Sequence, residues 1–102
     1  MINYERIIKD CFWDLNITSK NIDEILHKND LRRKKFLFNK ILLNSTRVLI
    51  DLEIFKSDEL KQMIEEYKVP TFNHDYIFRR KNIAEIFFLN KPVLVEELKW
   101  IA

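Results

Sequence analysis

Apolar residues recur along this chain at the three- and four-residue spacing of amphipathic helices, and every long periodic segment repeats at about 3.6 residues. The clearest segment follows Ser57, where four apolar residues obey the i, i+3, i+4, i+7 pattern: Leu60, Met63, Ile64 and Tyr67. Pro70 prevents that helix from continuing. Because the dipeptides of tight β-hairpins are also absent, the pattern predicts an all-α fold without a β-sheet.

Residues that favour helix starts divide the chain into six predicted helices. The predicted ranges are 3–12, 19–27, 31–43, 46–55, 58–67 and 74–89. The residues expected at their starts are Thr18 or Ser19, Asp30, Ser45, Ser57 and Asn73 for the second to the sixth helix. The segment from Pro92 is expected to be extended and then helical for one turn. Since neither a repeat nor a low-complexity linker is visible, residues 1–102 are predicted to form a single domain, a compact bundle.

Glycine is absent from all 102 residues, so the chain needs another residue to end its helices. Asparagine tolerates the left-handed backbone conformation best among the remaining residues. Asn29, Asn44 and Asn90 stand where such C-terminal caps are required. These three residues are therefore predicted to be structural.

Two of the predicted helices carry apolar residues on opposite sides. In the third helix Phe36 and Leu43 lie away from the main apolar face, and in the fourth helix Ile50 and Ile54 do the same. A helix that is apolar all round is usually buried in a core. The alternative is that one stripe is an oligomer or partner surface, which the aromatic content of 13% favours. Both interpretations stay open at this point.

Arg80 stands in the middle of the apolar face predicted for the sixth helix, between the edges marked by Tyr76 and Ile77. A guanidinium stays charged, so it must reach solvent, pair with a carboxylate or receive an anionic ligand. Asp14, Asp51 and Glu66 are the internal partners considered. Arg80 is otherwise a candidate for binding a carboxylate or phosphate of a partner.

Two basic runs suggest contact with nucleic acid as an alternative function. The residues are Arg32, Arg33, Lys34 and Lys35 in the third helix, with Arg79 and Lys81 in the sixth. Four cations at a helix N-terminus oppose the helix dipole, and phosphate contact would explain them. Acidic residues at helical spacing dilute both runs, however, and the net charge of +2 is too balanced to imply a polyanionic partner by itself.

The number and spacing of the histidine and cysteine residues do not favour a catalytic or metal-binding site. Two histidines and one cysteine, Cys11, fit no zinc-site spacing, and no base is evident beside the cysteine. His74 and Asp75 are adjacent, as in metal-dependent phosphohydrolases, but the further ligands of such sites are lacking. We expect no enzyme activity, no cofactor and no metal. A lone cysteine, a start without a secretion-signal pattern and no membrane-length apolar run lead us to expect a cytoplasmic protein without a membrane partner.

The segment Phe12-Trp13-Asp14-Leu15, followed by a capped helix and apolar helices, resembles a class of small uncharacterised bacterial helical proteins with an N-terminal FWD motif. Some members of that class are encoded beside abortive-infection nucleotidyltransferases, the toxin halves of toxin–antitoxin pairs. The resemblance implies an antitoxin-like or accessory protein-binding role and transfers no catalytic residue.

Taken together, the sequence favours a non-enzymatic helical interaction module that self-associates or binds a protein partner. The interaction residues are predicted to be Phe36, Leu43, Ile50, Ile54 and Arg80. A small nucleic-acid-binding regulator that uses the two basic runs is the alternative.

Overall fold

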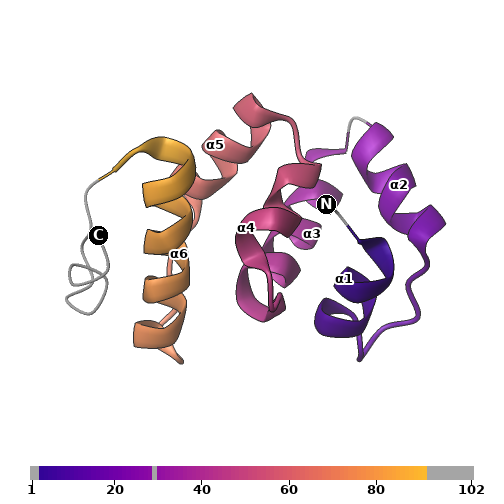
Figure 1. Ribbon diagram of the computed structural model, residues 1–102, viewed down its shortest axis with the longest axis horizontal. Helices are drawn as coiled ribbons and strands as arrows, with labels where there is room; N and C mark the ends of the chain where they lie inside the picture. The colour runs from indigo at the N-terminus through magenta and orange to yellow at the C-terminus, as the bar shows by residue number, and fades with distance from the viewer. Residues whose placement is uncertain (1–2, 29, 92–102) are drawn as a thin grey trace. The chain divides into compact units, whose positions relative to one another are not determined.

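All secondary structure that the computed structural model describes, over residues 3–28 and 30–91, is helical (Figure 1). The elements are α1 (Tyr4–Cys11), α2 (Ser19–His27), α3 (Leu31–Asn44), α4 (Val48–Asp51), the 3-10 helix η1 (Leu52–Ile54), α5 (Ser57–Glu66) and α6 (His74–Leu89). Helices account for 73% of these residues, and no strand occurs among them. The all-α prediction is confirmed. The conformation expected for the segment from Pro92 lies outside the described residues.

The N-terminal caps explain why three of the helices begin where they do. The side chains of Asn3, Thr18 and Asp30 accept backbone N–H groups at the starts of α1, α2 and α3. In α2 the cap is reciprocal, because the side chain of Asn21 accepts the amide of Thr18 at 3.0 Å. The predicted caps Thr18 and Asp30 are confirmed.

The fourth helix is shorter than the prediction of 46–55. The hydroxyl of Ser45 accepts the amide of Arg47 at 3.0 Å, which holds the chain in a turn before α4 begins at Val48. After Asp51 the helix tightens into η1, a common way for a short helix to end.

Left-handed backbone occurs at two asparagines among the described residues, Asn73 with φ 49° and Asn90 with φ 57°. Asn90 ends α6 as predicted. Asn73 precedes α6, but its side chain makes no capping hydrogen bond. The prediction for Asn44 was wrong: it is the last residue of α3, and Ser45 continues the chain with negative φ. Asn29 lies outside the described residues.

The described contacts fall into two units, one ending at Ser57 and the other beginning at Asp58. In the first unit α3 is the central helix, because it contacts α1, α2, α4 and η1. Its core consists of buried apolar side chains from α1, α2, α3 and η1 and from the residues that directly follow α1 and η1: Ile7, Cys11, Phe12, Ile22, Leu37, Phe38, Ile41, Leu42, Leu52 and Phe55. A single domain spanning 1–102 stays a prediction.

The second unit contains α6 and most of α5. The predicted apolar face of α5 is buried through Leu60, Met63 and Ile64. Just beyond α5, the backbone carbonyl of Tyr67 accepts a hydrogen bond from Lys81 Nζ of α6 at 2.7 Å. This contact fixes the chain after α5 to the middle of α6.

We expect Asn90→Ala to lower the free energy of unfolding by about 1 kcal/mol, because a Cβ-bearing residue without a polar side chain is strained in the left-handed region. Asn90→Gly should preserve or raise it. Asn39→Ala on the exposed side of α3 is the control and should not destabilise the protein. Urea unfolding followed by circular dichroism measures all three, and equal effects of alanine and glycine at position 90 would contradict the conformation.

Candidate functional site

A groove of about 470 Å³ opens on the N-terminal unit. Its walls come from α2, from α3 and from the segment that precedes α2, and the lining residues are Ile17, Asn21, Glu24, Ile25, Arg32, Arg33 and Phe36. Helical spacing explains the set, since residues three and four apart share one face of a helix. The side chains of Ile17, Ile25 and Phe36 make the groove largely apolar, and two arginines supply positive charge.

The ring of Phe36 is held in place although 43% of this residue is exposed. Its centroid lies 6.1 Å from that of Phe12, which is buried. Lys40 Nζ lies 5.9 Å from the centroid of the same ring, and Asp14 holds that ammonium at 3.1 Å. The aromatic wall is therefore preorganised for contact, which lowers the entropy cost of binding.

The two arginines of the groove differ in their partners. Arg33 Nε lies 3.4 Å from a carboxylate oxygen of Asp30. Arg32 is exposed, and no residue within the described ranges forms an ion pair or a side-chain hydrogen bond with its guanidinium. Among the described residues, Arg32 is thus the cation of the groove without an ion-pair partner.

Of the apolar residues predicted for interaction, only Phe36 lines this groove. Leu43, Ile50 and Ile54 belong to the same unit and are half-buried. The structure therefore gathers no single surface from all four. The groove residues that the sequence prediction missed come mainly from α2, where Ile25 follows the buried Ile22 on the edge of the apolar face.

The basic run of α3 does not form one solvated cluster. Lys34 is buried with 5% exposure, whereas Arg32, Arg33 and Lys35 are exposed. Lys34 lies one turn before Leu37 and Phe38, so the helical repeat carries it onto the buried face of α3. Three of the four cations that were predicted as candidates for phosphate contact at this helix start are therefore exposed, and the fourth is not.

In α6, Lys81 is engaged within its own unit. Its side chain is 18% exposed and, besides the Tyr67 carbonyl, lies 3.9 Å from Glu85, four residues on. Arg79 is half-buried and, like Lys81, belongs to the second unit, whereas the α3 run belongs to the first.

Arg80 is half-buried, and its guanidinium carbon lies 5.4 Å from the centroid of the Tyr76 ring. Tyr76 and Phe87, predicted to edge the apolar face, are exposed by 50% and 59%. The buried edge of α6 runs through Ile77 and Ala84 instead. Pairing of Arg80 with a carboxylate or an anion stays a prediction.

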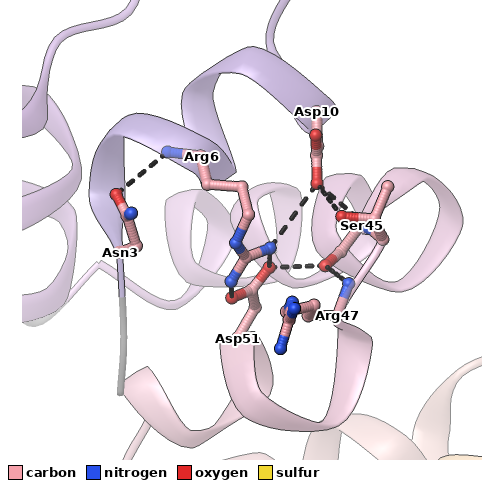
Figure 2. A network of polar contacts seen from close by, with 7 residues as sticks. Asn3, Arg6, Asp10, Ser45, Arg47 and Asp51 are labelled. Atoms are coloured by element: carbon pink, nitrogen blue, oxygen red, sulfur yellow. Dashed lines mark hydrogen bonds and ion pairs between the residues drawn. The ribbon is translucent and has the colours of Figure 1, made fainter.

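Two of the carboxylates considered for Arg80 have other partners. Asp14 pairs with Lys40, and Asp51 pairs with Arg6. Figure 2 shows the second pair at the centre of a polar network that joins α1, the turn after α3 and α4. Arg6 Nη1 donates to Asp51 Oδ2 at 2.9 Å, and Arg6 Nη2 donates to Asp51 Oδ1 at 2.5 Å.

The network satisfies a carboxylate that is fully removed from solvent. The side chain of Asp51 has 0% exposure, and Ser45 Oγ donates a second hydrogen bond to its Oδ2. Hydrogen bonding to Asp51 is the largest cause that raises the pKa of Arg6 above its ordinary range. Because a paired fork geometry and a hydroxyl surround the carboxylate, this network is structural rather than an open site.

Asp10 extends the network to the turn after α3. Thr46 donates to Asp10 Oδ2 through its hydroxyl at 2.6 Å and its amide at 3.1 Å, and Arg6 lies 3.5 Å from the same oxygen. The hydroxyl bond is the largest of the causes that lower the pKa of Asp10.

Within residues 3–28 and 30–91, no group of three or more histidine, cysteine, aspartate or glutamate side chains is placed to hold a metal ion. His74 Nδ1 lies 3.4 Å from Asp75 Oδ1, and the imidazole stacks on Phe78. No helix in the described part of the chain is long and apolar enough to cross a membrane.

We expect Asp51→Asn to lower the free energy of unfolding by about 3 kcal/mol, because the charge of Arg6 loses its buried partner. Asp14→Asn, which breaks a more exposed pair, should cost about 0 to 1 kcal/mol. A combined Arg6→Met, Asp51→Leu variant should lose less than Asp51→Asn alone, since no uncompensated charge remains. Urea unfolding measures the three, and equal losses for Asp51→Asn and Asp14→Asn would contradict the network.

Thr46→Val should raise the pKa of Asp10 toward its ordinary value of 3.8, because the hydroxyl donor is removed. The folded pKa of Asp10 lies below that value, so its stabilising contribution is complete above it and is lost as pH falls through the folded pKa. The variant should therefore be less stable than the wild type at neutral pH, and the difference should vanish in acid. Carboxyl NMR titration and unfolding against pH measure this, with Thr71→Val as a control expected to change neither.

Comparison of the sequence with known protein families and with curated proteins, and of the structure with solved structures, finds no match. The resemblance of Phe12-Trp13-Asp14-Leu15 to FWD-motif proteins stays a prediction. In the structure these residues have different environments: Phe12 is buried, Trp13 is 77% exposed and Asp14 pairs with Lys40.

Proposed function

We propose that this chain is a cytoplasmic, non-enzymatic helical module that binds protein surfaces through the groove between α2 and α3. The observation that carries the proposal is the ring of Phe36, which Phe12 and Lys40 hold in place while 43% of the residue remains exposed. Aromatic side chains in preorganised apolar surroundings supply much of the energy of protein interfaces.

The free energy gained by covering Phe36 is large enough to contribute to binding of a partner protein. Covering the exposed part of Phe36 removes on the order of 90 Å² of apolar surface from water, which contributes about 2 kcal/mol at about 25 cal/mol per Å². Ile17 and Ile25 are half-buried walls of the same groove and add further area. A second copy of the chain and a different protein are both served by such a surface.

Nucleic-acid binding has weaker support. Lys34 is buried, Arg33 pairs with Asp30, and Lys81 contacts a backbone carbonyl and Glu85. Few cations of the predicted basic runs thus remain to neutralise phosphates, which dominate affinity for nucleic acid.

We expect the wild type to form a dimer or higher oligomer at micromolar concentration, because the groove leaves apolar surface uncovered. Phe36→Ser should shift it toward the 12.5 kDa monomer. Leu31→Ser is the matched control, since Leu31 lies on α3 with 48% exposure but does not line the groove. Light scattering measures the mass, and circular dichroism confirms that each variant is folded.

Association through the apolar walls of the groove should weaken much less from low to high salt than binding through several phosphate contacts, which weakens steeply. A monomeric wild type would rule out self-association and restrict the proposal to a different protein. Equal effects of Phe36→Ser and Leu31→Ser would contradict the role of the groove.

A further inference from the structure

We infer that the groove receives a short segment of a partner protein in which a carboxylate residue neighbours a large apolar residue. This inference rests on the proposed function and names the chemistry of the partner. The apolar side chain packs against Ile25 and Phe36, and the carboxylate pairs with Arg32.

The charge of the groove selects an acidic residue. The guanidinium of Arg32 has no ion-pair partner among the described residues, and its planar donors match a carboxylate in a bidentate manner. Arg32 also lies in the first turn of α3, a helix of 14 residues, where a cation opposes the dipole and an arriving anion is favoured. A carboxylate beside Arg32 therefore gives the guanidinium an ion-pair partner and places a negative charge where the dipole of α3 favours one.

The opposite wall limits how acidic the segment can be. Glu24 and Asn21 of α2 line the same groove. The carboxylate of Glu24 repels a uniformly acidic ligand, whereas the backbone amides of a peptide can donate to it. One or two carboxylates beside an apolar anchor therefore fit better than an acidic run.

A peptide fits the groove better than a free fatty acid, although both combine apolar atoms with a carboxylate. Small-molecule pockets typically bury about 70 to 90% of their ligand. Here the walls themselves remain open to solvent, since Phe36 is 43% exposed and Ile17 and Ile25 are only half-buried. An acyl chain would leave much of its length in water, while a peptide places one side chain in the groove and continues along the surface.

The test uses the full chain and four synthetic peptides with blocked ends. The first has the sequence Ser-Ala-Asp-Leu-Phe-Asp-Ala-Ser. In the second peptide both aspartates are replaced by asparagine, in the third both are replaced by lysine, and in the fourth leucine and phenylalanine are replaced by serine. Calorimetry measures affinity and backbone NMR shifts locate the site, with sodium decanoate as a further ligand.

The acidic apolar peptide should bind most tightly, with shifts at Ile17, Ile25 and Phe36. Arg32→Gln should weaken it about tenfold, to the affinity of the asparagine peptide, and should leave the asparagine peptide unaffected. Lys35→Gln is the matched control, because Lys35 is an exposed cation of α3 that does not line the groove. Phe36→Ser should weaken the acidic and the asparagine peptides alike.

The remaining outcomes are distinct. If the peptides bind in a Phe36-dependent manner without preference for aspartate, the acidic partner is overturned and the proposed function stands. Binding of decanoate at the groove without binding of any peptide would overturn the inference in favour of a lipid carboxylate. If no peptide binds at about 1 mM and Phe36→Ser leaves the oligomeric state unchanged, the inference and the proposed function both fall.

Discussion

The arrangement of the N-terminal unit depends on the buried carboxylate of Asp51. A charge without solvent must be paired and hydrogen-bonded, and here Arg6 of α1 and Ser45 of the turn after α3 provide this from two other parts of the chain. The requirement is geometric as well as energetic, because the planar guanidinium can donate two hydrogen bonds to a carboxylate only when the two groups lie within a narrow range of positions. Pairing Arg6 with Asp51 therefore fixes α1 and α4 relative to one another and to the end of α3. Asp10 and Thr46 reinforce the same junction.

The groove follows from how the rest of α3 is covered. α3 contacts α1, α4 and η1 as well as α2, and its buried residues are shared among these neighbours. The helix α2 has nine residues and buries Ile22 completely, while Ile25, one turn along, stays at the edge. Across from this edge, the ring of Phe36 contacts Phe12, and 43% of Phe36 remains exposed.

The sequence predicted those features of the structure that depend on interactions between residues close together in the chain. Periodicity and caps located the helices, since a capping residue such as Thr18 acts on amides within its own first turn. These local patterns did not predict contacts between residues that are distant in sequence. Arg6 and Asp51 are 45 residues apart, and the pattern of neither helix by itself predicts that they pair. The signal that existed was Asp51 itself, a single acid within the apolar stretch Val48-Leu49-Ile50-Asp51-Leu52. The helical repeat places Lys34 on the buried face of α3, but the sequence analysis grouped it with the neighbouring cations as a basic run.

The contrast between Arg6 and Arg32 separates structural from available charge in this chain. Both guanidinium groups belong to helices of the same unit, yet Arg6 is committed to Asp51 and Asp10, whereas Arg32 borders an apolar groove and is paired with no described residue. Removing a partner from Arg6 leaves a partly buried charge uncompensated, so the fold itself selects for that carboxylate. Arg32 imposes no such demand on the fold, because solvent already satisfies it. A cation that the fold does not need, placed beside a preorganised aromatic ring, can change its partner at little cost to stability, and that freedom is what a binding surface requires.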